Sequence, residues 1–400
     1  MSKTKKTQQI RLIDEATIRS YRLDRVRQGL RAADHAGLIL FDPVNIRYAT
    51  GSRNMQVWTM HNPCRYVFIA TEGPVILFEL GSARHLAKDL ATIDEIRPAW
   101  AWDYMIVGER NEEMANNWAR EILDLIQLHG GGNRRVAIDR ADWLPVLSLQ
   151  RRGVEIVDGK PLMERARAIK SAEEITALKI SFQSCADSIA VLRQEAQPGM
   201  TESAALGLLL KEAITRGGEY PETRLLSSGP RTNPWFQETA DRVMQDGDLL
   251  SFDTDLIGRW GFYTDISRSW VIGERKPTDE QKRLYNLARQ QLEHNTALLR
   301  PGMSFREMST KSWPVPEAFI ANRYADIAHG VGLGVEYPLI WYQEDEAYGM
   351  YDGVFEENMV VCVESYIGAV GGRQGVKLEQ PVLITAEGPQ LFCDCPYEDY

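Results

Sequence analysis

The stretch FDTDLIGRWGFYTDISRSW, residues 252–270, decides the fold of this chain, because it sets Asp253, Asp255 and Asp265 inside an apolar segment. Aspartate is depleted from β-strands, and a carboxylate in a protein core is costly unless a partner neutralises it. Each aspartate taken alone is typical of a turn or of an edge strand. Three of them in one apolar segment call for a common explanation.

A hairpin would bring these three aspartates together. In an extended strand Asp253 and Asp255 are two residues apart, so their side chains would point to the same face. Gly258 and Gly261 then provide a loop, and Asp265 returns on the next strand. The stretch therefore predicts three carboxylates that converge on one point.

Three further candidates lie downstream, each interrupting an apolar run: His329 in ADIAHGVGLG, Glu364 in NMVVCVESYIG and Glu379 in VKLEQPVLIT. Buried carboxylates repel one another unless cations neutralise them. Five carboxylates and one imidazole form a hard, oxygen-rich donor set. We therefore expect two divalent transition-metal ions (iron, manganese, cobalt or zinc), held by Asp253, Asp255, Asp265, His329, Glu364 and Glu379.

The composition of the chain limits its partners and its location. The 400 residues carry a net charge of −10 and a sequence pI of about 5.3, which does not attract nucleic acid or anionic membranes. The five cysteines are odd in number and scattered, which indicates reduced thiols. The N-terminal segment lacks the apolar core of a signal peptide, and no apolar run reaches membrane-spanning length. We expect a cytoplasmic protein with no nucleic-acid or membrane partner.

The sequence pattern predicts two domains, residues 1–165 and residues 166–400. The first alternates strand and helix patterns, including a hairpin that turns at residues 72–74, as is typical of a small α/β domain. The second begins with a capping box, in which Ser171 and Glu174 would close the N-terminus of a long helix.

A weak internal repeat lies in the second domain. QPGMTESA begins at residue 197 and RPGMSFRE at residue 300, and each follows a long helical pattern. Thr201 and Ser304 are the candidate caps of the helices that come next. The repeat predicts two related half-domains, although Pro-Gly is also a common stop between unrelated helices.

Together these motifs resemble the pita-bread metalloenzymes, which include methionine aminopeptidases, aminopeptidase P, prolidase and creatinase. The aspartate stretch, HGVGLG, VCVES and KLEQPVLIT match the ligand motifs of that family in order, and DPVNIRYATG resembles its creatinase-type N-terminal domain. The resemblance covers nearly the whole chain. It implies an α/β (α+β) fold, in which a creatinase-like N-terminal domain precedes a pita-bread catalytic domain with a pseudo-twofold repeat and a dinuclear metal site.

Two histidines that the peptidases of this family usually carry are replaced. One normally follows a proline after an SGP-type turn, where this chain has Pro234 and then Trp235. The other normally lies seven residues after the ligand histidine, where this chain has Glu336. A peptidase without them would lose its usual acid–base groups.

The three aspartates, with NMQVWTMHNP, ETRLLSSGPRTNPWFQE and RYADIAHGVGL, resemble instead the branch of pita-bread dimethylsulfoniopropionate lyases.

This second resemblance implies a small sulfonium zwitterion as substrate, which is split into dimethyl sulfide and acrylate. Aromatic faces bind such cations, so Trp58, Trp235 and Tyr324 are candidate substrate contacts, although aromatic residues also fill cores. In that branch an aspartate six residues after the ligand histidine is taken as the base, and here the residue is Val335. Glu336 and Tyr324 remain as catalytic candidates, but in an extended segment Glu336 would point away from Val335.

Three functions therefore stay open. The first is a metal-dependent lyase that acts on a small zwitterion. The second is a metal-dependent C–N hydrolase, either an Xaa-Pro aminopeptidase or dipeptidase or a creatinase-like enzyme. The third is a binding protein on the same fold. In related enzymes the N-terminal domain of one subunit closes the pocket of the other, which implies a homodimer.

Overall fold

The structure, a computed structural model, describes residues 13–400 and divides into two compact units. The first unit comprises the chain up to Gly159 together with Ser171–Ala177, and the second comprises Lys160–Lys170 and Leu178–Tyr400. The sequence pattern predicts a single boundary after residue 165, whereas residues 160–170 belong to the second unit as a whole.

The first unit is built on one six-stranded mixed sheet in the order β4-β3-β2-β1-β5-β6. Its strands are β1 (Gly37–Leu40), β2 (Tyr66–Ala70), β3 (Val75–Glu79), β4 (Glu95–Pro98), β5 (Arg135–Ile138) and β6 (Glu155–Asp158). The predicted hairpin is confirmed, because β2 pairs antiparallel with β3 across the turn at residues 71–74.

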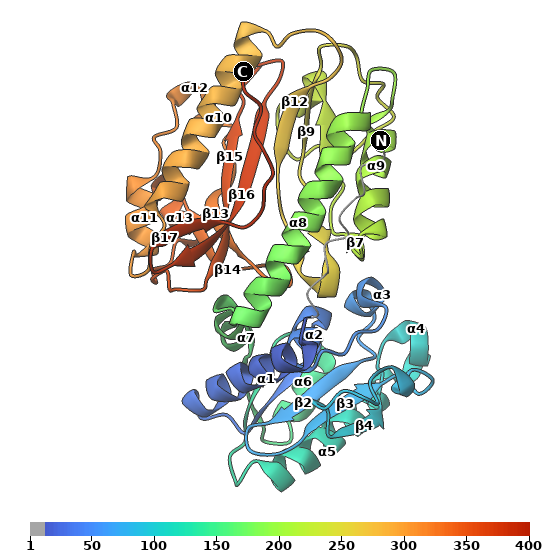
Figure 1. The fold of residues 1–400 in the computed structure, drawn as a ribbon. Coiled ribbons are helices and arrows are strands. Elements are labelled where there is room, and N and C mark those ends of the chain that lie inside the picture. Colours follow the sequence, from blue (N-terminus) through green and yellow to red (C-terminus); the bar gives the residue numbers. More distant parts are fainter. Residues whose placement is uncertain (1–12) are drawn as a thin grey trace, which may run out of the picture. The chain divides into compact units, whose positions relative to one another are not determined.

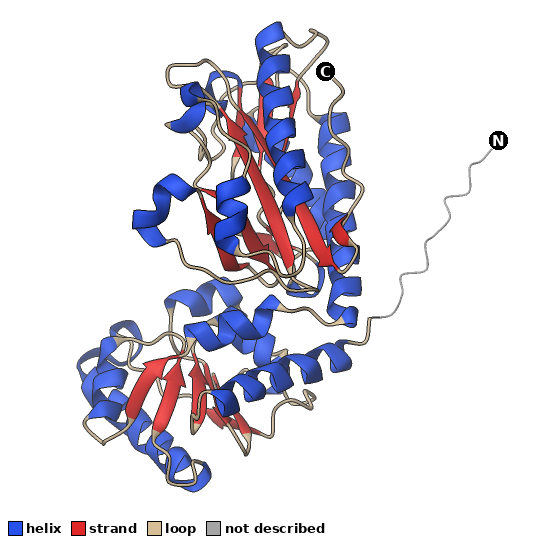
Figure 2. Cartoon of the chain, turned by 90° about the vertical axis from the view of Figure 1, so that its left-hand side faces the viewer, coloured by secondary structure: helices blue, strands red, loops and turns tan. Residues whose placement is uncertain are grey.

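Helices lie against this sheet (Figure 2). They are α1 (Glu15–Ala32), α2 (Pro43–Thr50), α3 (Gln56–His61), α4 (Tyr104–Val107), α5 (Asn111–His129) and α6 (Trp143–Gln150). The side chains of Asp14 and Asp42 accept hydrogen bonds from backbone N–H groups in the first turns of α1 and α2, so both helices begin at capped ends. The core includes the rings of Tyr66, Phe78 and Trp118, all buried.

The second unit contains one five-stranded sheet in the order β14-β13-β15-β16-β17 and two three-stranded sheets, β12-β9-β8 and β11-β10-β7. The strands of the large sheet are β13 (Asp326–Val331), β14 (Val335–Trp341), β15 (Val360–Ile367), β16 (Val376–Thr385) and β17 (Gly388–Leu391). Those of the small sheets are β7 (Tyr220–Pro221), β8 (Leu226–Ser228), β9 (Leu249–Phe252), β10 (Leu256–Ile257), β11 (Tyr263–Thr264) and β12 (Arg268–Val271).

Long helices cover the sheets of the second unit (Figure 1). The helices that follow the first unit are α7 (Lys160–Ala168), α8 (Ala172–Glu195), α9 (Glu202–Thr215), α10 (Asp279–Leu298), α11 (Phe305–Lys311), α12 (Glu317–Ile320) and α13 (Glu346–Gly349). Helix α10 packs on β15 and β16 through Leu284, Ala288 and Leu292, which are buried with the apolar side chains of those strands. Helix α10 therefore packs on the sheet that carries three of the predicted ligands, His329, Glu364 and Glu379.

Helix α8 begins as the sequence predicts. Ser171 N–H donates to Glu174 at 2.9 Å, and Glu174 N–H donates to Ser171 Oγ at 3.2 Å, which is a capping box. The expectation that no apolar run is long enough to span a membrane needs a correction, because α8 meets that criterion by length and composition. Half of its most apolar window is buried inside the structure, as in a core helix.

Candidate metal centre

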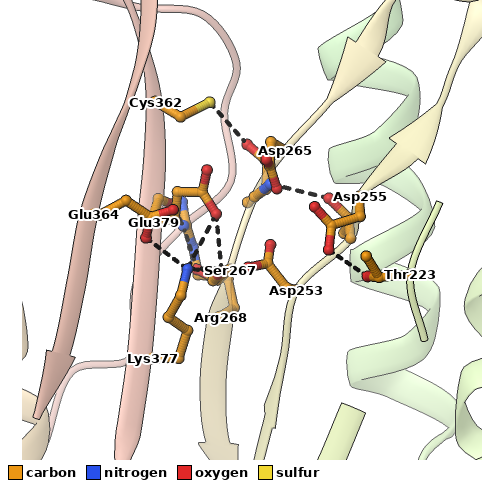
Figure 3. A network of polar contacts seen from close by, with 12 residues as sticks. Thr223, Asp253, Asp255, Asp265, Ser267, Arg268, Cys362, Glu364, Lys377 and Glu379 are labelled. Atoms are coloured by element: carbon orange, nitrogen blue, oxygen red, sulfur yellow. Dashed lines mark hydrogen bonds and ion pairs between the residues drawn. The ribbon is translucent and has the colours of Figure 1, made fainter. Parts of the chain in front are cut away.

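Three of the six predicted ligands lie on the five-stranded sheet, the other three lie next to strands of the two small sheets, and all six are buried. Their exposed fractions are 3% for Asp253, 7% for Asp255, 2% for Asp265, 4% for His329, 1% for Glu364 and 0% for Glu379. His329 lies on β13, Glu364 on β15 and Glu379 on β16, and in the ladder of β15 and β16 Glu364 is directly opposite Glu379. Asp253, Asp255 and Asp265 face Glu364 and Glu379 (Figure 3).

The prediction that Asp253 and Asp255 share one strand is wrong. Strand β9 ends at Phe252, and Asp255 has a left-handed backbone with φ 41°. The hydroxyl of Thr254 donates to the carbonyl of Thr264 at 2.9 Å and accepts from the N–H of Ile266 at 2.9 Å. These bonds tie the turn to the returning segment, so a tight irregular turn, and not strand alternation, places the three aspartates together.

The ligand atoms form three overlapping groups, and within each group all atoms lie within 4.8 Å of one another. The groups are Asp253, Asp255 and Asp265; Asp253, Glu364 and Glu379; and Asp265, His329, Cys362 and Glu379. His329 Nε2 lies 3.4 Å from Glu364, 3.6 Å from Glu379 and 3.7 Å from Asp265. Shared members link the groups into one continuous cluster.

The donor set fits a divalent cation. Within residues 13–400, one buried oxygen each of Asp253, Asp265, Glu364 and Glu379 accepts no hydrogen bond. Buried polar atoms are normally satisfied, and an unpaired buried charge is costly. A metal ion would satisfy all four oxygens, and carboxylate oxygens with imidazole suit divalent transition metals.

Burial and the mutual repulsion of the carboxylates also shift the pKa values of the cluster. Burial and the charge of Asp253 raise the pKa of Asp255 to about 7. Burial and the neighbouring carboxylates Asp253 and Glu364 raise the pKa of Glu379 to about 7. Burial also raises the pKa of Asp253, but the Lys377 ammonium and hydrogen bonds more than offset it and lower that pKa to about 2. Without a divalent cation the cluster holds protons near neutral pH, and a bound metal would release them.

A seventh residue, Lys377, belongs to the cluster and was missed in the sequence. Its side chain is fully buried, and its ammonium contacts Glu364 at 2.6 Å and Asp253 at 3.0 Å. The signal was present in VKLEQPVLIT, because a lysine two residues before Glu379 on a strand shares its face. Lysine is seldom buried unless it is paired, so a lysine in an apolar strand indicates an acidic partner nearby.

Burial raises the pKa of the Cys362 thiol, as do the neighbouring carboxylates of Glu379 and Asp265. The thiol donates a hydrogen bond to the backbone carbonyl of Asp265 at 3.6 Å. A protonated thiol is a poor metal ligand.

The predicted catalytic residues lie in different surroundings. Glu336 is buried on β14, where its carboxylate contacts Lys170 at 2.5 Å and Arg167 at 3.2 Å. Val335, the preceding residue, is 49% exposed, so the two side chains alternate as expected. Tyr324 lies beside the cluster, with its ring centroid 4.4 Å from the Lys377 ammonium.

The predicted aromatic contacts are divided between the two units. Trp235 is buried in the second unit beside Tyr324, and its ring lies 5.8 Å from the Lys377 ammonium. Phe236, which the sequence did not single out, is 59% exposed and stacks on Tyr324 at 5.5 Å. Trp58 lies on α3 of the first unit and is 39% exposed.

Family models agree with this architecture. Residues 176–386 match the metallopeptidase family M24, and residues 22–169 match the creatinase/prolidase N-terminal domain. Because the first match spans more than half of the chain, the protein belongs to metallopeptidase family M24. The α/β fold, the creatinase-type N-terminal domain and the pita-bread catalytic domain predicted from the sequence are confirmed. Enzymes of this family use divalent metal ions, and the buried cluster has the donors for them.

Within the family, the chain is similar to two curated relatives over nearly its whole length. It is 38% identical to dimethylsulfoniopropionate lyase DddP of Roseovarius nubinhibens, over 97% of this chain and 88% of that protein. It is 36% identical to dimethylsulfoniopropionate lyase DddP of Roseobacter denitrificans, over 98% of this chain and 89% of that protein. The Xaa-Pro aminopeptidase of Escherichia coli is 28% identical, over 58% of each chain.

Among solved structures, the Xaa-Pro dipeptidase from Bacillus anthracis superposes with a TM-score of 0.75. The alignment covers 95% of this chain and 98% of that one at 20% identity. At this identity the likeness shows the fold alone.

Proposed function

We propose that this protein is a metal-dependent lyase that cleaves the C–S bond of dimethylsulfoniopropionate, or of a closely related sulfonium zwitterion, to release dimethyl sulfide. The observation that carries the proposal is the identity of 38% and 36%, over nearly the full chain, with two enzymes of that name. The peptidase relative is less similar and aligns over little more than half of the chain.

The reaction is a β-elimination. A base removes the proton from the carbon beside the substrate carboxylate, a carbon–carbon double bond forms, and the electron pair of the C–S bond leaves on sulfur. The products are acrylate, neutral dimethyl sulfide and one proton. Two divalent ions (iron, manganese, cobalt or zinc), held by Asp253, Asp255, Asp265, His329, Glu364 and Glu379, would supply a Lewis acid for the carboxylate end of the substrate.

Tyr324 acts in this proposal as a neutral hydrogen-bond donor. Burial and the neighbouring Glu364 carboxylate raise the pKa of its phenol well above the ordinary value, and the Lys377 ammonium only partly opposes them. The phenolate is therefore absent at neutral pH. A phenol beside the cluster orients a substrate oxygen, and it does not remove the carbon proton.

Glu336 remains the candidate proton acceptor in this proposal, at a cost. Lys170 and Arg167 hold its carboxylate, so accepting a proton would weaken two buried ion pairs. The enzyme is therefore expected to turn over dimethylsulfoniopropionate slowly, since a well-placed base contributes about 10²–10⁴-fold.

The sulfonium end of the substrate would meet a group of aromatic rings, one of which already has the Lys377 ammonium over its face. That ring is Tyr324. Phe236 is exposed on the same aromatic group and offers a further face. We propose that Trp235, Phe236 and Tyr324 line the cationic end of the pocket, with Trp58 contributed by the partner subunit of a cytoplasmic homodimer.

A C–N hydrolase is the second candidate, because the family and its solved structures include Xaa-Pro peptidases. The replacement of both peptidase histidines, by Trp235 and Glu336, weighs against it. The hydrolase candidate predicts that the protein cleaves amide bonds and releases no dimethyl sulfide.

The test uses the full chain loaded separately with iron, manganese, cobalt and zinc. Headspace dimethyl sulfide is measured over dimethylsulfoniopropionate, and the same preparations are assayed on Xaa-Pro dipeptides. Dimethyl sulfide formation that disappears in Glu379→Ala supports the lyase. Amide cleavage alone would establish the hydrolase, and neither activity with any metal would leave a binding protein.

A further inference from the structure

Lys377 lies at the centre of a network of polar contacts in the second unit (Figure 3). Its side chain on β16 is fully buried. Its ammonium nitrogen lies 2.6 Å from Glu364 Oε2, 2.7 Å from Ser267 Oγ, 3.0 Å from Asp253 Oδ2 and 3.3 Å from Glu379 Oε2. Four acceptors compete for three N–H groups, so no donor remains for a substrate.

These acceptors come from two different sheets. Glu364 and Glu379 lie on β15 and β16 of the five-stranded sheet. Asp253 directly follows β9, and Ser267 directly precedes β12, in one of the three-stranded sheets. The ammonium therefore joins the two sheets at the point where the ligand side chains meet.

The charge of the cluster requires a cation of this kind. Two divalent ions would neutralise four of the five carboxylates, and His329 would have to be neutral to bind a metal. One negative charge remains, and a single ammonium cancels it. Arg268, the other cation in Figure 3, donates to the backbone carbonyls of Ser267, Glu379 and Cys395 and to the side chain of Gln380, so it does not meet a carboxylate of the cluster.

We infer that Lys377 is a built-in counter-ion of the metal centre: it positions Asp253 and Glu364 across the two sheets and neutralises the carboxylate that two divalent ions leave unbalanced. Lys377 is thus a positioning residue and does not touch the reacting atoms. The inference concerns metal binding and stability, and it holds whether the enzyme is a lyase or a hydrolase.

The test is the thermal unfolding of the full chain, stripped of metal by a chelator and then reloaded with Mn²⁺. Lys377→Met keeps the volume and removes the charge, which leaves buried carboxylates uncompensated. The Tm of the metal-free variant is expected to fall by roughly 6–20 °C below the metal-free wild type. Mn²⁺ should then raise the Tm of the variant by more than it raises the Tm of the wild type. A metal-free Tm within about 2 °C of the wild type would overturn the inference.

A double-mutant cycle separates charge from packing. If Lys377 compensates Glu364, then Lys377→Met in a Glu364→Gln background should lower Tm by less than half as much as it does alone. Equal losses in both backgrounds would mean that Lys377 is a packing residue. Lys211→Met, at a side chain 72% exposed, is the matched control and should leave Tm unchanged.

A second pair of variants keeps the test decisive if Lys377→Met does not fold. Lys377→Arg retains the charge, and Lys377→Gln retains a donor without it. The metal-free arginine variant should melt closer to the wild type than the glutamine variant does. The reverse order, or equal melting, would show that the charge is not what the site requires.

Discussion

Val335 and Glu336 show how one residue step along a strand separates an exposed side chain from a buried one. Val335 begins β14 with its side chain 49% exposed, whereas Glu336 is buried against Lys170 and Arg167. In the lyase branch that the sequence resembles, the position of Val335 holds the base. Because the valine side chain is half-exposed, a charge can be placed there without being buried.

Val335→Asp should therefore raise turnover on dimethylsulfoniopropionate, by up to about 10²–10⁴-fold if a missing base limits the rate. The Tm and the metal content should stay close to the wild type, since exposed substitutions change stability by about 0.5 kcal/mol or less. The measurement is steady-state dimethyl sulfide release with metal content determined in parallel. Val335→Asn is the control, because asparagine has the same shape as aspartate but lacks its carboxylate. Equal rates for the aspartate and asparagine variants would place the base elsewhere.

The ligand assignment has its own test at the residue scale. Asp265→Ala and Glu379→Ala should each remove most of the bound metal, because each belongs to two of the three ligand groups. Cys362→Ala should keep its metal, because the Cys362 thiol donates to the backbone carbonyl of Asp265 and the carboxylates and His329 supply the remaining donors. Elemental analysis after gel filtration measures all three. Full metal content in both carboxylate variants would refute the assignment.

At the scale of elements, the two PGM segments make matching contacts. Thr201 caps α9 and Ser304 caps α11, each through its side chain as the sequence predicts. Thr201 also forms an isolated bridge with Val243, and Ser304 forms the same kind of bridge with Val354. The two PGM turns thus make the same pair of contacts, which supports the proposed repeat of two half-domains.

Glu336 on β14 is one of the links to α7, because it pairs with Arg167 on α7 and with Lys170 just beyond it. Glu336→Gln would leave two buried cations without their shared carboxylate, at a cost of about 3–5 kcal/mol. Denaturant unfolding should show that loss, and Glu344→Gln, at a side chain 73% exposed, should show none. If Glu336→Gln is as stable as the wild type but lacks activity, Glu336 is a base and not a clamp.

At the scale of the whole molecule, the first unit exposes apolar side chains in two segments. Met55, Val57 and Trp58 lie in and before α3, and Tyr104, Met105 and Ile106 lie in α4, with exposed fractions from 39% to 68%. A solvent-exposed apolar surface of this kind is typical of a protein–protein interface. It supports the proposed homodimer.

Light scattering at micromolar concentration should therefore give about twice the chain mass of 45.4 kDa. If Trp58 completes the pocket of the partner, Trp58→Ala should raise KM while leaving the mass unchanged. Trp143→Ala is the matched control, since Trp143 is 73% exposed in the same unit. A fully active monomer would contradict the proposal.

The sequence by itself determined the features that depend on local pattern. Helix caps at Ser171, Thr201 and Ser304 and the β2–β3 hairpin follow from a few neighbouring residues. The burial of the six candidate ligands also follows from local pattern, because each interrupts an apolar run that packs in the core.

The tertiary structure alone decided which charges meet. Lys377 and Glu336 are both buried charged residues on strands. The strand pattern places Lys377 on the face of Glu379, but no local pattern states that its ammonium also meets Asp253 or that Glu336 pairs with Lys170. Their partners lie on segments more than 100 residues away, at Asp253 and Lys170. The cost of a buried charge depends on the distance to its counter-charge, and that distance exists only once the sheets have packed.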